Sequence, residues 1–600
     1  MRRRLTGVLV VAVFAASACG QSTGSPSASA FVPVAFSSKP ATSAGTQTAG
    51  ITGSTYKAVP ATNTTGKVVL GEWQFPDTVN PYYALNSIDM TDMEVSDSMF
   101  DGLLTVTPDL KYAPDLALNV PTLDNGGVVL NGDGMDVNWK LRLGMEWSDG
   151  QPITCDDIAT TWRWVLDKDN HGLAEGTVGW QDVSGVDGGP GTDCVMHFSK
   201  IYEGYLTLVS PLLPAHYITT IPVKDAQSKL YPMSNLAGGV YSGPYIPASV
   251  EGNSKINLKP NPKWQSIGGH VPWLTSVTWR YYGDAGTMIN GFAAGDYDVG
   301  NGLTNANESA LTTTDTSKVV AQNSMIYELL AFNNASFAKK YPDDASYIIQ
   351  AIKLATDRQA IAKGPLGGFV SVTNNPVSPQ SWYYKDIGGS TTADAATAYT
   401  ILANAGWIKG TDGYLVKAGK PLTISLCTTT RQFRLDSLNL IAQQLQAIGI
   451  KASVNTRPDS SVFGLWDQTT VDTQCNLRHG NFDVAEFTYR VPFDPLSGYR
   501  VYHSSQIPEN MPRHDGENIS RISLPTLDAA YETIASTVNL SKVRDAMSSV
   551  QDLYGSDRNT YELPLYFRKD VWLVNPKLHN FIGNPTFSAG EWNMGDWWVG

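Results

Sequence analysis

The sequence predicts a mixed α/β (α+β) protein with at least two lobes. After Gly66, 534 residues remain, which is more than one ordinary domain contains. The first part of this body is rich in short strands and turns, including a predicted hairpin at 128–143 around the turn sequence NGDG. The later part predicts a strand at 422–427, a helix at 435–448 and a strand at 450–454. This order is a βαβ unit, so we expect an α/β core there.

The elements of the first part follow from short apolar runs and turn residues. Strands are predicted where apolar runs are bounded by Gly, Pro, Asn or Asp, and helices where apolar residues recur every three or four positions. Thr154 and Asp157 form the pattern of a capping box at the start of one helix. In chain order, we expect a strand at 67–73, a helix at 90–104, strands at 128–130 and 137–143, a helix at 155–166, strands at 195–198, 241–245, 256–258 and 277–282, a helix at 285–294 and a strand at Val299.

The elements of the second part include longer helices. A long amphipathic helix is predicted at 346–362 and contains the sequence Ala355-Thr356-Asp357-Arg358, while Gly406 and Gly449 end two further predicted helices. In chain order, we expect helices at 346–362 and 393–405, a strand at 422–427, a helix at 435–448, strands at 450–454 and 484–488, helices at 527–534 and 541–554, and strands at 563–567 and 571–573.

The N-terminus has the pattern of an export signal. Met1 is followed by three arginines, an apolar run of 14 residues at 5–18 and then Cys19. Such a run is too short to cross about 30 Å of hydrocarbon but suits a signal peptide. The small residues before Cys19 resemble the lipobox of bacterial lipoproteins, which implies removal of residues 1–18, lipidation of Cys19 and anchoring to the outer face of the cytoplasmic membrane. The alternative is an ordinary signal peptide with an incidental cysteine.

Residues 19–66 predict a flexible tether. Ser, Thr, Ala, Gly and Pro dominate this segment, and large apolar residues do not recur with the period of a strand or a helix. Such a segment cannot bury enough surface to offset the entropy of ordering it. We therefore expect a linker between the membrane and a folded body that begins at Lys67.

Charge and hydropathy exclude two classes of function. The formal charge is −13 and becomes −16 when the three arginines of the signal peptide are removed. Binding of nucleic acid requires clustered Lys and Arg, so we expect no nucleic-acid partner. No apolar run after the signal peptide reaches 18 residues, so we expect no transmembrane helix.

Four cysteines lie in the exported body: Cys155, Cys194, Cys427 and Cys475. Four cysteines in an oxidising compartment allow three pairings, and sequence proximity favours Cys155–Cys194 and Cys427–Cys475. Four free buried thiols are the alternative. The chain has no CxxC pattern and its histidines are scattered, so we expect no zinc site and no cofactor.

The stretch Trp139–Ile158, WKLRLGMEWSDGQPITCDDI, carries the most specific pattern in the chain. Together with shorter segments in the same order, it resembles the peptide-binding lipoproteins of bacterial ABC importers, the dipeptide, oligopeptide and nickel solute-binding family. Cys155 stands where this family usually has Ala, and we assign Trp147 and the turn at Asp149 to the fold. The shorter segments are FDGLL at 100–104, YAPDLA at 112–117, GPY at 243–245, NPKW at 261–264, GDYDV at 295–299, FNN at 332–334, LQAIGI at 445–450 and DP at 494–495.

The resemblance implies a two-lobed periplasmic-binding-protein-like fold, with a hinge between the lobes and an additional subdomain in lobe I. It implies crossover strands near 329–330 and near 563–566, with lobe I at 67–328 and 566–600 and lobe II at 329–565. It also implies a monomeric protein without enzymatic activity. Such a protein captures an oligopeptide or peptide-like solute between closing lobes and delivers it to ABC transporter permease subunits.

Members of this family commonly hold the amino terminus of the peptide with an Asp a few residues before an Asp-Pro or Glu-Pro dipeptide. Here that position falls on Val491 or Pro492, and Asp494 is the nearest carboxylate. A buried ammonium without a carboxylate is strongly unfavourable, so this departure weakens the case for a free amino terminus. Arg490 is a candidate partner for an anionic ligand group. The alternatives are a surface salt bridge for Arg490 and a turn position for Asp494.

Four aromatic residues are candidate walls of the ligand cleft. Trp73 ends the first predicted strand and Phe75 follows it. Tyr489 precedes the Asp-Pro segment, and Trp382 lies in a proline-bounded loop of lobe II. Aromatic side chains supply large, rigid contact surfaces for a ligand. Core packing is the alternative for Trp73 and Tyr489, and a surface aromatic patch is the alternative for Trp382.

Two other functions stand as alternatives. An exported hydrolase would need a catalytic constellation, and the chain contains no GxSxG, no HExxH and no SxxK with KTG. Its many carboxylates leave a glycosidase pair open. Within binding proteins, the ligand could instead be a glycoside, a metal chelate or a haem-like molecule.

Overall fold

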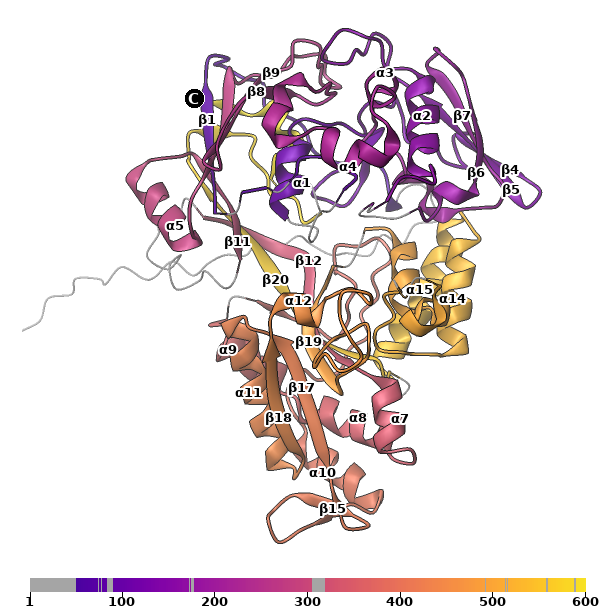
Figure 1. The fold of residues 1–600 in the computed structure, drawn as a ribbon, viewed down its shortest axis with the longest axis vertical. Helices are drawn as coiled ribbons and strands as arrows, with labels where there is room; N and C mark the ends of the chain where they lie inside the picture. Colours follow the sequence, from indigo (N-terminus) through magenta and orange to yellow (C-terminus); the bar gives the residue numbers. More distant parts are fainter. Residues whose placement is uncertain are drawn as a thin grey trace, which may run out of the picture. The chain divides into compact units, whose positions relative to one another are not determined.

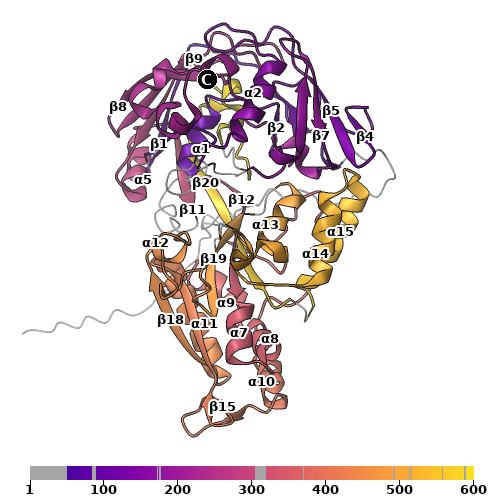
Figure 2. The ribbon, with the colours of Figure 1, turned by 45° about the vertical axis from the view of Figure 1, so that its right-hand side comes forward.

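Two long antiparallel strands form the centre of the fold. In the computed structural model, β12 (Val319–Phe332) pairs with β20 (Glu562–Val574), and the two contain the expected crossing points at 329–330 and 563–566. Figures 1 and 2 show them side by side between the indigo-to-magenta part and the orange part of the chain. We call the chain before β12 and after β20 lobe I, and the chain between them lobe II. The structure describes residues 50–600 apart from 74, 77, 84–89, 172, 174–176, 305–318, 369, 491–492, 513, 515, 557–558 and 587–589.

One eleven-stranded sheet continues from lobe I into lobe II through these two strands. Because β1 pairs in parallel with both β10 and β11, and β19 pairs in parallel with β17, each lobe has its own parallel region. The short strand β13 (Ser371–Val372) pairs with β20 beside the main path. From lobe I to lobe II, the order is β8 (Tyr245–Glu251), β9 (Lys255–Pro260), β10 (Ser276–Tyr281), β1 (Lys67–Glu72), β11 (Val299–Thr304), β20, β12, β19 (Val484–Arg490), β17 (Thr423–Thr429) and β18 (Lys451–Arg457).

A separate four-stranded sheet forms a subdomain of lobe I. The order of its strands is β4 (Val128–Asn131), β5 (Gly134–Lys140), β7 (Asp193–Phe198) and β6 (Val183–Asp187), so the predicted hairpin is confirmed as β4 and β5. The helix α2 (Cys155–Val165) begins with the predicted capping box of Thr154 and Asp157. The predicted disulfide Cys155–Cys194 is confirmed and joins α2 to β7. Trp147 is fully buried and donates from Nε1 to Asp157 Oδ2 over 3.3 Å, which supports its structural role.

Lobe II contains the predicted α/β core. Strands β17 and β18 are parallel and are joined by α11 (Gln432–Ala447), which confirms the βαβ unit. Apolar side chains of α11, including Ile441 and Leu445, are fully buried against Leu426 and the other residues of this core. The second predicted disulfide, Cys427–Cys475, is also confirmed and ties β17 to the loop before β19.

A pair of helices forms the other side of lobe II. Helices α14 (Pro525–Ala535) and α15 (Leu540–Tyr554) pack on each other, and Figures 1 and 2 show them together beneath lobe I. They have an apolar cluster of their own, in which Tyr531 and Val543 meet Val377 and Tyr383 from the proline-bounded loop. The predicted helices at 527–534 and 541–554 are therefore confirmed.

The long helix predicted at 346–362 is wrong, because the structure has two shorter helices, α8 (Ala345–Ala355) and α9 (Arg358–Lys363). Asp357 caps α9, with its carboxylate accepting from Ala360 N over 2.8 Å. Arg358 can then point inward, where it donates to the carbonyl oxygen of Thr373 over 2.7 Å and to that of Pro564 over 3.1 Å.

Two other boundaries differ from the prediction. The helix expected at 90–104 ends early, as α1 (Met90–Asp97), and the chain then forms β2 (Leu104–Val106). The strands expected at 563–567 and 571–573 are one strand, β20, because the polar residues between them continue the pairing with β12.

The expected boundary between tether and body at Lys67 is also wrong. Residues 50–66 lie against lobe I, and Ile51 is only 5% exposed. The hydroxyl of Tyr56 donates to Asp596 over 2.8 Å. These scattered anchors among small polar residues have no period, which is why composition alone placed the segment in the tether.

A search for membrane-spanning helices in the described part of the chain finds none.

The elements not yet described are short. The remaining elements are β3 (Tyr112–Pro114), α3 (Ala215–Ile218), α4 (Ala226–Lys229), α5 (Ala285–Ala294), α7 (Asn334–Lys340), α10 (Ala395–Asn404), β14 (Ile408–Lys409), β15 (Leu415–Lys417), β16 (Lys420–Pro421), α12 (Asp459–Val462), α13 (Gly498–Tyr502), β21 (Leu578–His579) and β22 (Trp598–Val599), with 3-10 turns that include η3 (Glu203–Leu206), η8 (Pro495–Ser497) and η11 (Glu591–Asp596).

Candidate functional site

A small cavity lies where lobe I meets lobe II, and we call this place the seam. Lobe I contributes Tyr112 of β3 and Glu203 of η3, and lobe II contributes Trp382 and Asp494. The cavity has a volume of about 30 Å³. Ligand pockets usually measure roughly 300–1,000 Å³. The structure therefore shows the seam closed, and the lobes have to separate there before a ligand can enter.

Two carboxyl groups meet in the seam. Asp494 caps η8 and accepts a hydrogen bond from Leu496 N over 2.8 Å, which fixes its side chain at the lobe II side. Glu203 is the first residue of η3 on the lobe I side. The carboxyl group of Glu203 is hydrogen-bonded to that of Asp494, so the two lobes are linked by an acid pair.

A hydrogen bond between two carboxyl groups requires at least one proton, which the acid pair shares. Burial raises the pKa of Glu203 well above its ordinary value, and the charge of Asp494 raises it further. Burial also raises the pKa of Asp494, although the hydrogen bond from Glu203 opposes this rise. Glu203 therefore keeps the proton and donates it to the Asp494 carboxylate. Among the described residues, no Lys or Arg forms an ion pair with either carboxyl group.

Aromatic rings surround the acid pair. The ring of Tyr112 meets the ring of Phe493 edge to face, with 4.7 Å between their centroids. Tyr205 donates to the carbonyl oxygen of Pro121 over 2.9 Å, which fixes its ring in the wall. These rings give the seam a rigid apolar surface around a charged centre, as in sites that bind organic cations or peptide ends.

Of the six predicted ligand-binding residues, the structure brings Asp494 and Trp382 together in the seam. The signal for their partner, Glu203, is absent from the sequence around Asp494, because the two residues are far apart in the chain. Tyr112 and Phe493 were also missed, although both belong to segments of the resemblance or lie beside one.

Three of the other predicted residues lie elsewhere, and the fourth is not described. Trp73 directly follows β1 and is 36% exposed. Phe75 packs edge to face on Tyr281 of β10, with 4.7 Å between the ring centroids. Tyr489 of β19 donates to the carbonyl oxygen of Glu517 over 3.2 Å. The side chain of Arg490, like residues 491–492, lies outside the described part of the structure.

A second charged cluster lies at the crossover strands. Glu328 of β12 is fully buried and accepts from Arg434 Nη2 of α11 and Arg568 Nε of β20, each over 3.1 Å. Burial raises the pKa of Glu328, but the two arginines outweigh it and hold that pKa below its ordinary value. Beside it, burial and the charge of Glu328 raise the pKa of Glu486 well above its ordinary value. Among the described residues no hydrogen bond reaches either carboxyl oxygen of Glu486.

Neither the seam nor the charged cluster at the crossover strands has a set of described side chains that could bind a metal ion. Within the described residues, no group of three or more His, Cys, Asp or Glu side chains has the geometry of a metal site. The acid pair of the seam consists of two carboxyls only.

Two lobes that share one sheet, joined by β12 and β20 and meeting again at a closed seam, define the two-lobed periplasmic-binding-protein fold. The family model of the bacterial extracellular solute-binding proteins, family 5, matches residues 111–506. The chain belongs to this family, whose members serve bacterial ABC importers of peptides and nickel.

Relatives of known character agree with this assignment. The oligopeptide-binding protein AppA of Bacillus subtilis is 25% identical over 457 residues, which are 74% of this chain and 77% of that protein. The structure of the same protein in complex with a nonapeptide has a TM-score of 0.67, with 22% identity over 90% of this chain and 99% of that one. A periplasmic EDTA-binding protein, EppA, has a TM-score of 0.73 with 19% identity, over 93% of this chain and 99% of that one. The structural comparisons show the shared fold.

Proposed function

We propose that the protein is the substrate-binding lipoprotein of an ABC importer that captures oligopeptides or peptide-like solutes between its lobes and delivers them to a permease. The observation that carries the choice of ligand is the acid pair of Glu203 and Asp494 in the seam. The pair has no Lys or Arg partner among the described residues, and the ammonium group of a peptide amino terminus supplies a cation for it. The rings of Tyr112 and Phe493 then cover the first residues of the peptide.

In this proposal, the acid pair takes the role of the carboxylate that is missing before the Asp-Pro dipeptide. The sequence places Val491 and Pro492 where the family has a carboxylate. Glu203, from the opposite lobe, adds a second carboxyl to Asp494, so both lobes hold the same ligand group. Ligand binding then favours closure, because the two halves of the site meet only when the lobes do.

Isothermal titration with synthetic peptides tests the proposal. We expect peptides of three to nine residues with a free amino terminus to bind, and the same peptides with an acetylated amino terminus to bind at least about tenfold more weakly. The ammonium should also displace the shared proton, so the measured heat should depend on the ionisation enthalpy of the buffer at neutral pH. Equal binding of free and acetylated peptides, without proton release, would show that the acid pair does not bind the amino terminus of the peptide.

The same proposal includes attachment to the membrane through Cys19. An acylated cysteine carries more than one acyl chain in lipoproteins of the kind that the lipobox resembles, and two or more chains anchor stably. Replacement of Cys19 by Ala should release the protein from the membrane fraction into the medium. Retention of the Cys19→Ala protein in the membrane would contradict the anchor and leave the ligand assignment untouched.

A further inference from the structure

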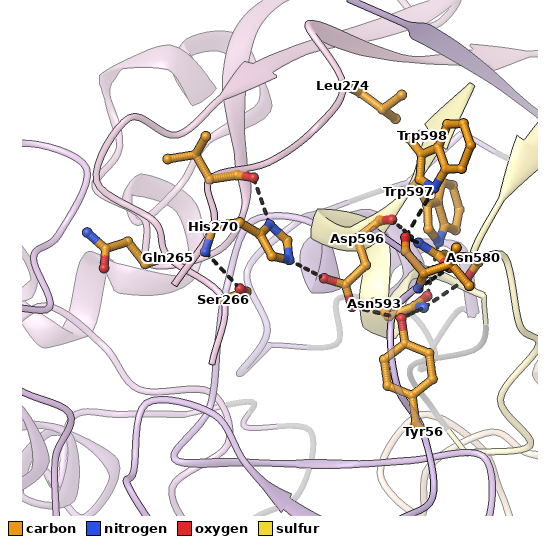
Figure 3. A network of polar contacts seen from close by, with 12 residues as sticks. Tyr56, Gln265, Ser266, His270, Leu274, Asn580, Asn593, Asp596, Trp597 and Trp598 are labelled. Carbon is orange, nitrogen blue, oxygen red and sulfur yellow. Dashed lines mark hydrogen bonds and ion pairs between the residues drawn. The ribbon is translucent and has the colours of Figure 1, made fainter. Parts of the chain in front are cut away.

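The segment that connects the body to the N-terminus is fastened to lobe I. Tyr56 donates to Asp596 Oδ2 over 2.8 Å and accepts from Asn593 Nδ2 over 2.7 Å. His270 Nε2 lies 2.9 Å from Asp596 Oδ1, so one carboxylate joins the segment to two other parts of lobe I (Figure 3). This network holds the segment close to the end of the chain at β22.

A second set of bonds extends the attachment along the chain. Asn580 pairs with the backbone of Val59 in both directions: the Val59 N–H donates to Asn580 Oδ1, and Asn580 Nδ2 donates to the Val59 carbonyl oxygen, each over 2.9 Å. Trp598 Nε1 also donates to that carbonyl oxygen over 3.2 Å. Burial and the charge of Asp596 raise the pKa of Tyr56, so its hydroxyl stays a donor at all physiological pH values.

The first described residues, Gly50 to Thr52, leave this attachment and reach the seam. The N–H of Tyr112 donates to the carbonyl oxygen of Ile51 over 2.7 Å, and Thr52 forms a parallel bridge with Tyr112. The ammonium of Lys111 donates to the carbonyl oxygen of Gly50. The segment is thereby bonded to the backbone of β3 in lobe I through an isolated bridge.

Two of these residues, Gly50 and Ile51, also contact lobe II. A Cβ placed on Gly50 would lie 3.4 Å from Arg544 Nη2 and 3.6 Å from Trp382, so the Gly50 backbone rests directly on lobe II. The guanidinium of Arg544 lies 5.5 Å from the centre of the Trp382 ring, which braces this surface. Ile51 is 5% exposed and lines the seam cavity together with Leu540 of α15.

We propose that Gly50–Thr52 is an intramolecular latch that stabilises the closed arrangement of the lobes. The segment is held on lobe I by hydrogen bonds that do not depend on closure, whereas the burial of Ile51 against lobe II exists only when the seam is closed. Opening must expose Ile51 and separate Gly50 from Trp382, which costs apolar burial. Because this seam is the proposed ligand site, the inference deepens the proposed function and rests on it for its biological meaning.

The latch also connects the membrane tether to ligand capture. Gly50, the first described residue, lies at the seam next to Trp382. A ligand that enters the seam must either displace Ile51 or bind beneath it. Either way, the occupancy of the seam and the position of this segment are coupled.

The latch proposal is tested by measuring the distance between the lobes in the absence of ligand. Dyes on Leu118→Cys in lobe I and Ile408→Cys in lobe II, both at exposed positions, report the distance between the lobes by energy transfer in the full-length mature protein. We expect Ile51→Asp to raise the ratio of open to closed molecules by at least about tenfold, and Ile51→Ala to raise it by a smaller factor. Val59→Asp is the matched control, because Val59 lies in the same segment, is 58% exposed and contacts lobe I.

Two results would overturn the latch. One is an unchanged open-to-closed ratio in Ile51→Asp and in Ile51→Ala, with both proteins melting as the parent does. The other is an equal shift in Val59→Asp, which would assign the effect to loss of the whole segment. Since no ligand is added, failure of peptides to bind would leave this measurement intact, and the two proposals fail separately.

Discussion

Replacement of Glu328 by Gln should destabilise the protein through the crossover strands. Glu328 is fully buried and bonds Arg434 and Arg568, which are themselves largely buried. Removal of one partner from a buried ionic cluster costs roughly 3–5 kcal/mol. The remaining charges lose their counter-ion but stay buried, so water cannot solvate them. In Glu328→Gln, both arginines would lose their carboxylate partner at the junction of β12, β20 and α11.

The neighbouring Glu486 sets the size of the effect. Its pKa is raised by burial and by the charge of Glu328, and both causes favour the protonated form in the parent protein. In Glu328→Gln that repulsion disappears, and Glu486 can ionise beside Arg434 and Arg568 in place of the lost carboxylate. We therefore expect Glu328→Gln to cost about 3 kcal/mol, the low end of the range for a broken buried pair.

A double-mutant cycle measures this compensation. Glu486→Gln alone should change the free energy of unfolding by less than about 1 kcal/mol, because an amide has the shape of the protonated acid. The double variant should lose at least about 1 kcal/mol more than the two single effects together. Urea unfolding at neutral pH, followed by tryptophan fluorescence, gives the three values. Additive effects would show that Glu486 does not take over the charge, and the account of this cluster would fail.

Three further outcomes follow from other contacts. Arg358→Met should lower the free energy of unfolding by at least about 3 kcal/mol, because buried carbonyls lose a charged donor; a loss below about 1 kcal/mol would contradict this. Replacing both Cys155 and Cys194 by Ser should cost about 4 kcal/mol from the entropy of a loop with a separation of 39 residues, as measured by urea unfolding. An unchanged midpoint would refute that role. Because Asp494 and Glu203 have raised pKa values, their pair stabilises the protein below the ordinary pKa of about 4.5, and this contribution is lost as pH rises through the raised values. A double variant with Asn at 494 and Gln at 203 should show a flatter pH dependence of the melting temperature above about pH 5. A slope equal to that of the parent protein would contradict the contribution of the acid pair.

Local patterns predicted the fold well where a short segment determines its own structure. The capping box at Thr154 and Asp157 positions α2, and the spacing of apolar residues before Gly449 positions α11 between two strands. Proximity in sequence was enough for both disulfides, because each closes a loop within one lobe. The same reasoning failed at Asp357, where a capping carboxylate breaks an apolar pattern that continues through the break.

The candidate site could be predicted only in part, because it is made by contacts across the two lobes. Asp494 was found from its dipeptide with Pro495, but Glu203 carries no local sign that it will face another carboxyl. Ile51 stands alone among Ser, Thr and Gly, so no periodicity marks it for burial. The roles of such residues depend on contacts with segments that are distant in the sequence. The sequence pattern of a single segment holds no information about those contacts.

Native mass spectrometry of the protein purified from its own cells tests the central claim most directly. A closed seam retains its ligand during gentle purification, so the complex should carry added masses of short peptides. Acid release and sequencing should then find peptides with free amino termini. A co-purified sugar or metal chelate with no peptide would contradict the account.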